Sequence, residues 1–316
     1  MAENKIIGLH IAGRTAVETL AGIIRAEERG IRSAWLTTGG PAPDGLTLCA
    51  VAAAQTSRIL LGTAITPTYP RHPLVTVQQT LAVAQLGPGR FRLGVGPSHK
   101  PTMEGMFGIP FEKPLTHLRA YLAVLKGMLH DGAVERGDEP FRVNARLAAP
   151  VDVPVMASAL QEKSFELCGE VADGAITWMC PTAYVRDVAL PAFKRGAEHA
   201  NRPLPKLVVH VPVCVSEETD AVREAVRRQF GRYMAVPSYA RMTAAAGFEE
   251  STRAAMTDAH IDALVAHGDE LRVAEKLREW FALGADEIIA APFGAGPDPE
   301  ETTERTISLI AALSKR

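Results

Sequence analysis

RILLGTAITPTYPRHPLVTVQQTLAVAQLGPGRFRLGVGPSH, residues 58–99, contains a complete strand–helix–strand unit. The apolar and β-branched run from Arg58 to Ile65 predicts one strand, and Phe91 to Val95 predicts the next. A helix begins between them at Pro73, which suits the first helical position because its missing N–H would be unpaired there. The inner face of this helix carries Leu74, Val77, Leu81 and Ala84. Two strands joined by a helix are expected to lie parallel in one sheet.

The same alternation continues in both directions from this unit. Further strands are expected at 6–11, 33–36, 153–157, 175–179, 207–215 and 286–291. Helical patterns separate them, so the whole chain, residues 1–316, is predicted to be one α/β domain, a (β/α)8 TIM barrel. Residues 97–114 are rich in Gly and Pro and too long for an ordinary connection, so we expect an insertion over the C-terminal mouth of the barrel.

A doubly wound open sheet is the competing architecture. Its dinucleotide fingerprint, GxGxxG between a first strand and helix, is absent from the sequence. Gly94-Val95-Gly96 lacks the third glycine and follows the fourth expected strand. The barrel is therefore favoured.

Composition excludes several classes of protein. Hydrophobic residues make up 47% of the 316 residues, which allows a large core, and the net charge of −2 without a basic tract argues against a nucleic-acid partner. No apolar stretch approaches the roughly 18 residues that span a bilayer, and the N-terminus resembles no signal peptide. The four cysteines form no CxxC pair or metal-ligand spacing: Cys49, Cys168, Cys180 and Cys214. We expect reduced, buried thiols, no metal site and a cytoplasmic protein.

Polar or small residues follow three of the expected strands. These are the segments 62–73, 89–99 and 155–160. Barrel enzymes keep their chemistry at the C-terminal ends of the strands. Small residues before a helix, as in 157–160, also allow a phosphate to approach the free N–H groups of the helix N-terminus.

The segments 60–99, 153–157 and 170–174 resemble the luciferase-like flavin and deazaflavin oxidoreductases, and in particular the branch that uses coenzyme F420. The resemblance touches about two thirds of the chain, with a looser match over 268–284. It implies a barrel with the ring of the cofactor across its mouth, a small-molecule substrate and, we expect, a homodimer. It also implies a non-proline cis peptide bond between Ala64 and Ile65, against the back of the ring.

The resemblance also places the cofactor contacts. Ser98 and His99 match positions that reach the cofactor, 157–160 matches the phosphate junction, and Trp178 and Met179 would border the ring or substrate. The full set expected to bind the cofactor is Thr63, Ala64, Ile65, Thr66, Gly96, Ser98, His99, Ala157, Ser158, Ala159, Leu160 and Trp178.

One departure from the family concerns proton transfer. Many relatives follow the Trp of the second strand with a His or Asp, whereas this chain has Trp35-Leu36-Thr37-Thr38. The catalytic residues we expect are His99 or His10 for the proton and Thr38. Thr37, Thr38 and Trp178 are expected to shape the pocket. His10 has the alternative of capping the sheet.

Two other residues of the 58–99 unit carry open alternatives. His72 has the alternative of capping the helix at Pro73. Arg71 is expected either to contact the acidic tail of the cofactor or to lie in solvent.

The expected activity is hydride transfer between F420 and a small organic substrate. Two alternatives remain open. One is an FMN-dependent monooxygenase on the same fold, and the other is a non-catalytic barrel that binds a ligand or partner.

Overall fold

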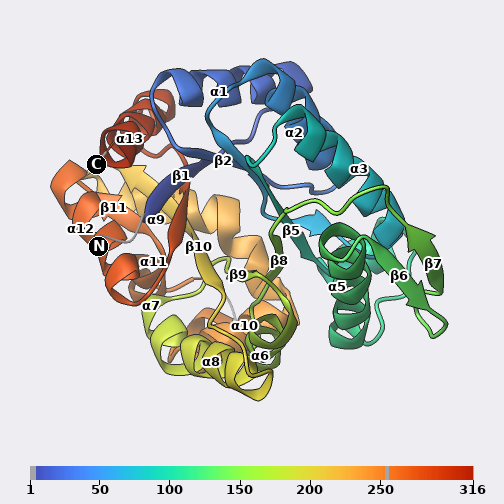
Figure 1. Cartoon of the computed structure of the whole chain (residues 1–316). Helices are drawn as coiled ribbons and strands as arrows, with labels where there is room; N and C mark the ends of the chain where they lie inside the picture. The colour runs from blue at the N-terminus through green and yellow to red at the C-terminus, as the bar shows by residue number, and fades with distance from the viewer. Residues whose placement is uncertain (1–4, 253–255, 316) are drawn as a thin grey trace.

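The computed structural model describes residues 5–252 and 256–315. Within these residues eight parallel strands form a closed ring, because β1 pairs with β2 on one side and with β12 on the other (Figure 1). In ring order they are β1 (Ile6–His10), β2 (Ser33–Leu36), β3 (Leu60–Thr63), β5 (Phe91–Gly96), β8 (Val155–Ser158), β9 (Gly174–Ile176), β10 (Lys206–Val215) and β12 (Glu287–Pro292). The predicted TIM barrel is confirmed.

Eight helices surround the ring and follow its strands in turn (Figure 1). They are α1 (Ala16–Glu28), α2 (Gly45–Gln55), α3 (Pro73–Leu86), α5 (Pro114–His130), α6 (Glu162–Val171), α8 (Leu190–His199), α12 (Glu270–Ala282) and α13 (Pro299–Ser314). The last helix returns to the first strand, where the Ser314 hydroxyl donates to the Ile7 carbonyl at 2.5 Å. The end of α13 therefore lies against β1.

The interior of the barrel is filled by side chains rather than open. Its central layer consists of Trp35, Ala64, Met156, Ile176, Val208 and Ile289. Below it, Glu287 accepts hydrogen bonds from Ser33 at 2.6 Å and from the Trp35 indole at 2.7 Å, and pairs with Arg92. The outward-facing residues of the strands pack against the helices in the main core.

Two segments differ in detail from their prediction, and a hairpin that was not predicted adds to the ring. The hairpin consists of β6 (Ala133–Arg136) and β7 (Val143–Arg146). The strand expected at 175–179 ends at Ile176. The region 97–113 contains a short helix, α4 (Lys100–Gly105), which its Gly and Pro content had concealed.

The long helical stretch after β10 forms a series of short elements. They are α9 (Thr219–Phe230), η2 (Gly231–Ala235), α10 (Pro237–Ala245), η3 (Glu249–Thr252) and α11 (Asp258–Leu264), followed by β11 (Ala266–Gly268). β11 pairs with the last residues of β10. The connection from α7 (Thr182–Tyr184) through η1 (Val185–Ala189) leads similarly into α8.

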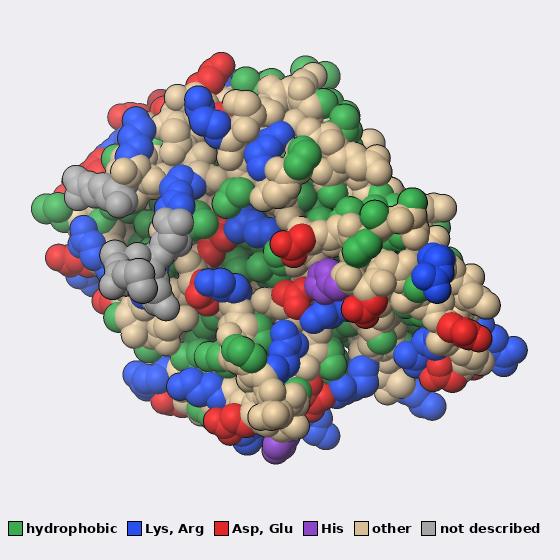
Figure 2. All heavy atoms as spheres, in the orientation of Figure 1, with side chains coloured by type: hydrophobic (Ala, Val, Ile, Leu, Met, Phe, Trp, Pro, Cys, Tyr) green, Lys and Arg blue, Asp and Glu red, His purple; other side chains and the backbone are tan. Residues whose placement is uncertain are grey.

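Other expectations from composition also have structural outcomes. All four cysteines are buried and unpaired. No helix in the described ranges combines the length and apolarity needed to cross a bilayer. On the face shown in Figure 2, basic and acidic side chains are interspersed rather than separated into areas of one sign.

Candidate active site

The floor of the barrel mouth takes one inward-facing residue from nearly every strand. Side chains alternate along a strand, so the residue two positions beyond an interior residue also faces inward. Trp35, Met156, Ile176 and Val208 belong to the interior layer. The next inward positions, with those of the remaining strands, are His10, Thr37, Gly96, Ser158, Trp178 and His210, and Ala64 of the interior layer lies beside them. These residues we call the mouth floor.

His10 and Thr37 form a hydrogen-bonded pair in this floor. The Thr37 hydroxyl donates to the Ala64 carbonyl at 2.6 Å and lies 3.1 Å from Nε2 of His10. A hydroxyl has a single proton, and here it goes to the carbonyl, so Thr37 accepts a hydrogen bond from His10. Nε2 therefore carries the proton of the neutral imidazole, which leaves the Nδ1 lone pair as its acceptor.

Burial reinforces the neutral form of this imidazole. It lowers the pKa of His10 to about 4, because desolvation disfavours the imidazolium. Burial also lowers the pKa of His210 well below the ordinary value, with a further contribution from His10. At neutral pH the floor thus presents two uncharged imidazoles whose ring centroids are 5.0 Å apart.

Small residues shape the other side of the floor. The peptide bond between Ala64 and Ile65 is cis, as predicted. The bulge there is held to the second strand, because Ala64 donates to the Leu36 carbonyl at 2.8 Å and Ile65 accepts from the Thr38 N–H at 3.2 Å. A Cβ at Gly96 would lie 2.1 Å from the Ser158 hydroxyl, so only glycine leaves room for that side chain.

An aromatic wall rises from the floor toward the rim. Trp178 contacts His210 with ring centroids 4.3 Å apart and Tyr233 at 6.0 Å. Tyr233 contacts Tyr239, and His99 lies against Tyr239 at 5.4 Å. Burial lowers the pKa of His99. A continuous series of ring contacts through His210, Trp178 and Tyr233 therefore links His10 in the floor to His99 at the rim.

The rim is built from two insertions that meet. His99 precedes α4 in the segment expected to cover the mouth, whereas Tyr233 and Tyr239 come from η2 and α10. The Gln161 side chain also donates to the Ser238 carbonyl at 2.6 Å. The predicted insertion thus covers the mouth together with the segment after β10.

The threonines expected at the site have mixed placements. Thr63 and Thr66 are fully buried and expose no surface to the mouth. The Thr63 hydroxyl instead bridges to β5, donating to the Gly94 carbonyl at 2.7 Å. Thr38 accepts from the Gly45 N–H at 2.9 Å, at the start of α2. Of the two threonines expected to shape the pocket, Thr37, which is exposed, is the one that contacts His10.

The phosphate junction 157–160 also differs from its expectation. Ala157 is fully buried, and the Ala159 N–H donates to the Ile176 carbonyl at 2.9 Å. The Leu160 N–H donates to the Ser164 hydroxyl at 3.0 Å. These two N–H groups are not free, because the capping box of α6 and the turn from β8 already use them. Ser158 and Leu160 keep partly exposed side chains.

Two neighbours of the mouth have structural partners. The His72 side chain accepts from the Leu74 N–H at 3.3 Å, which is the helix-cap alternative. Arg71 lies in neither of its two expected surroundings, because it pairs with Asp44 at 2.6 Å.

Sequence reasoning missed three members of this site. His210, Tyr233 and Tyr239 had no local motif around them. The alternation along 207–215 would have placed His210 inside the barrel, had Val208 been recognised as inward-facing. No signal in the sequence places the two tyrosines at the rim, because only the packing of η2 and α10 over the mouth does so.

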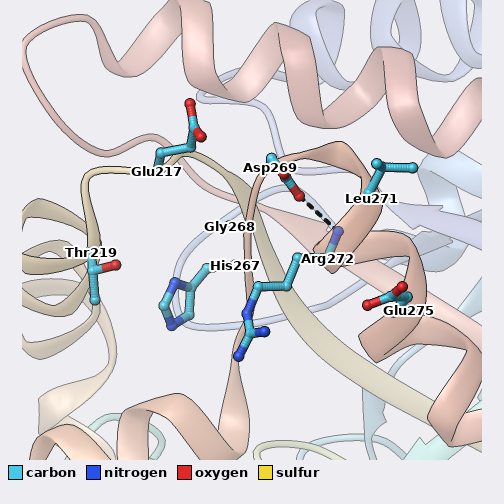
Figure 3. Close-up of a pocket in the computed structure, with 8 residues that line it drawn as sticks. All are labelled: Glu217, Thr219, His267, Gly268, Asp269, Leu271, Arg272 and Glu275. Atoms are coloured by element: carbon cyan, nitrogen blue, oxygen red, sulfur yellow. Dashed lines mark hydrogen bonds between the residues drawn. The ribbon is translucent and has the colours of Figure 1, made fainter.

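A separate cavity of about 450 Å³ lies beside β11 and the start of α12 (Figure 3). It is lined by Glu217, Thr219, His267, Gly268, Asp269, Leu271, Arg272 and Glu275. Several of its polar groups already have partners, since Asp269 accepts from the Arg272 N–H at 2.8 Å and His267 pairs with Asp262 at 3.0 Å. None of its residues belongs to the mouth floor.

The outer surface carries one group with potential metal ligands among the described residues. Glu166, Glu170 and His199 place ligand atoms within 4.8 Å of one another. Arg119 already pairs with Glu170. We assign no ion to this group, and the expectation of a metal-free protein stays a prediction.

Comparisons with known proteins agree with this geometry. A family model described as "Luciferase-like monooxygenase" matches residues 8–287. The F420-dependent glucose-6-phosphate dehydrogenase of Beutenbergia cavernae is 32% identical over 233 residues, 66% of this chain and 68% of that protein. The 5,10-methylenetetrahydromethanopterin reductase of Methanolobus tindarius is 30% identical over 202 residues, 63% of this chain. The match spans only 61% of the length of that reductase.

Solved structures share the fold. An F420-dependent secondary alcohol dehydrogenase in complex with an F420-acetone adduct superposes with a TM-score of 0.80 at 18% identity, covering 97% of this chain and 98% of that one. The oxygenating constituent of 3,6-diketocamphane monooxygenase of Pseudomonas putida, in complex with FMN, gives 0.71 at 17% identity, covering 98% and 97%. At these identities the likeness concerns the barrel alone.

Proposed function

Because the chain belongs to the luciferase-like monooxygenase family, we propose that it is an oxidoreductase that moves a hydride between coenzyme F420 and a small organic substrate. The observation that carries the proposal is the mouth floor, where the neutral His10, hydrogen-bonded to Thr37 through Nε2, lies among small residues and against the aromatic wall. A sequence relative named as an F420-dependent dehydrogenase supports the choice of cofactor.

The residues present fit a flat aromatic cofactor. On one side of the floor the side chains of Ala64, Gly96 and Ser158 are small and leave room for a flat ring. On the other side, Trp178 and the tyrosines of the aromatic wall border the floor. F420 supplies a ring carbon in place of a flavin nitrogen, so its reduced form donates a hydride and reacts poorly with oxygen. The protein then has to position the substrate, exclude water and move one proton.

Each chain residue has a defined part in this proposal. His10 accepts or returns the proton at Nδ1, and Thr37 keeps its Nε2 protonated. His99 closes the wall from the rim and is the second candidate for the proton. Ser158 and Leu160 would border the phosphate of the cofactor. The phosphate would need N–H donors from other residues, because the N–H groups of Ala159 and Leu160 are already hydrogen-bonded.

The acidic tail of F420 has fewer cationic partners than expected. Arg71 pairs with Asp44, and Lys100 lies 3.7 Å from Glu104. Lys113 is exposed at the start of α5. Since such contacts are in water, we expect them to add little affinity and to weaken as salt rises.

Titration with F420 tests the proposal. Protein made in a host without F420 should be colourless and should bind added F420 with a Kd in the micromolar range, about −8 kcal/mol. Fluorescence quenching at two ionic strengths measures this Kd and its weak dependence on salt. A yellow protein with stoichiometric FMN and no response to F420 would support the FMN-dependent monooxygenase instead, which the family description and the FMN-bound structural neighbour keep as the second candidate. Binding of F420 without turnover of any substrate would leave a non-catalytic barrel.

The remaining expectations are also proposals. We propose a homodimer in the cytoplasm; the four unpaired thiols support a reducing compartment. Sedimentation analysis of the purified chain measures the oligomeric state, and a monomer would contradict the first part.

A further inference from the structure

Two ring nitrogens of the candidate site are buried without a hydrogen-bond partner. They are Nε1 of Trp178 and Nε2 of His210. The His210 side chain belongs to a residue only 6% exposed, and it faces the interior of the barrel two positions beyond Val208. Buried polar atoms nearly always have partners, so an unpartnered pair in one place points to a missing ligand.

The two rings that carry these nitrogens are in contact, with centroids 4.3 Å apart, and the His210 ring lies 5.0 Å from that of His10. His10 belongs to the same floor. A ligand atom that reaches the Trp178–His210 pair therefore lies near the group proposed to move the proton.

The chemistry of the pair restricts that ligand atom. An indole N–H can only donate, whereas a neutral imidazole nitrogen either donates or accepts. A carbonyl oxygen accepts from both, and a hydroxyl accepts from Trp178 while donating to His210. Resting on the proposed function, we propose that Trp178 and His210 form a subsite for the oxygen of a neutral ketone or alcohol substrate.

The surroundings of the pair argue for a neutral substrate. The rings that contact Trp178 or His210 are those of His10, Phe230 and Tyr233, and burial keeps the imidazoles uncharged. Arg232 is the cation that lies over the outer ring of Tyr233, 5.4 Å from its centroid, and it is exposed. A carboxylate at the pair would thus lose its hydration without gaining a buried cation.

Equilibrium binding without turnover tests the subsite. The probes are acetone, cyclohexanone and acetophenone with the corresponding alcohols, against acetate, cyclohexanecarboxylate and benzoate. Saturation-transfer NMR is recorded with all probes on the chain alone. The ketones and carboxylates are also recorded on the chain with oxidised F420, which cannot reduce a ketone, whereas the alcohols are left out there because oxidised F420 would accept their hydride. Trp178→Phe and His210→Phe keep a ring but remove the nitrogens, and Tyr233→Phe is the matched control in the same wall.

We expect at least one neutral ketone or alcohol to bind more tightly than its matched carboxylate. Each nitrogen-removing variant should weaken that binding by about tenfold, while Tyr233→Phe changes it less than about twofold. The Kd for F420 is measured in parallel for all three variants, and in the two nitrogen-removing variants the ketone should lose more affinity than F420 does. If the two variants weaken F420 and leave the ketone unchanged, the pair belongs to the cofactor and the subsite is rejected.

The remaining outcomes separate the two proposals. Binding of the carboxylates at least as tight as that of the neutral probes, or no binding of any neutral probe, rejects the subsite while F420 binding still stands. Failure of the unaltered chain to bind F420 rejects the proposed cofactor, and the ketone titration of the chain alone then still judges the subsite.

Discussion

At the scale of single residues, His10 shows how two neighbours determine the state of a side chain. Burial keeps its imidazole neutral, and Thr37 selects the tautomer with the proton on Nε2 because its own proton goes to the Ala64 carbonyl. A neutral imidazole of this tautomer is prepared to accept a proton at Nδ1. Substrate oxidation is thus the direction in which His10 needs no prior protonation.

The pH dependence of hydride transfer should follow from this state. We expect the single-turnover rate to be flat between pH 6 and 8 and to fall only as the pH approaches about 4, where His10 becomes charged. The folded pKa lies below the unfolded value of 6.5, so protonation also disfavours the fold, and this contribution to stability is lost as pH falls from 6.5 toward 4. Nitrogen NMR of labelled His10 should show the Nε2–H tautomer. In Thr37→Val, which lacks the hydroxyl that accepts from Nε2, both neutral tautomers should be populated. A rate that titrates near pH 6.5 would contradict the assignment.

A comparison of two histidines separates a site residue from a structural one. We expect His99→Ala to lower kcat/KM at least about tenfold, because His99 closes the wall of the mouth. Loss of a group that takes part in acid–base catalysis lowers the rate by at least this much. His72→Ala should leave kcat/KM unchanged and cost about 1 kcal/mol of stability, since His72 caps α3. Steady-state kinetics and chemical denaturation of both variants measure these effects. Equal and small losses of activity would show that His99 stays outside the chemistry.

At the scale of elements, the carboxylate of Glu27 connects α1 to the segment that leads into β3. Glu27, at the end of α1, accepts from the N–H groups of Ser57, Arg58 and Ile59 at 3.0, 2.7 and 2.9 Å. Burial raises its pKa, but these three hydrogen bonds outweigh that effect and the net pKa lies below 4.5. The chain thus enters β3 with its N–H groups satisfied from a different element.

Removing this charge should destabilise the protein. We expect Glu27→Gln to cost about 1–2 kcal/mol, because an amide accepts fewer and weaker hydrogen bonds from three backbone donors. The folded pKa is depressed, so the contribution is present above pH 4.5 and is lost as the pH falls through the folded value. Urea denaturation at pH 7 and pH 3.5 measures both effects, with the exposed Glu28→Gln as control. A loss that is the same at both pH values would contradict the role of the charge.

At the scale of the whole molecule, the barrel is closed by the last strand against the first, and Glu287 crosses the interior at that closure. It joins β12 to β2 through Ser33 and Trp35, and to β5 through Arg92. The Arg92 guanidinium also lies over the Trp35 ring, 4.4 Å from its centroid. Glu287 thereby holds together residues of β2 and β5 that lie more than 190 positions before it in the chain.

Removing one charge of the Arg92–Glu287 pair should destabilise the protein more than replacing both charges with apolar side chains. We expect Glu287→Gln and Arg92→Met each to lower stability by about 3–5 kcal/mol, because the partner stays buried with no counter-charge. The double variant Arg92→Met with Glu287→Leu should be less destabilised than the sum of the two single changes. Guanidinium denaturation of all three variants tests this, and strictly additive losses would show that the two charges act independently.

The order of strands and helices was predictable from the sequence, because it depends on local periodicity and on turn residues that act within a few positions. The same holds for the cap at His72 and for the insertion after β5. A resemblance in segment 60–99, rather than physical reasoning, indicated the cis bond after Ala64. The candidate site was predictable in part, since His10, Ser158 and Trp178 each follow from a strand end.

Only the tertiary structure decided which polar groups remain free. The Gly94 carbonyl accepts from the Thr63 hydroxyl and Asp44 pairs with Arg71, and neither pairing is visible from spacing alone. His210 and the tyrosines of η2 and α10 lie more than a hundred positions along the chain from β1, β2 and β3. They reach the mouth only because these distant segments pack together. Closure of the ring turns eight separate strand ends into one floor, because side chains far apart in the chain become neighbours only when the last strand pairs with the first.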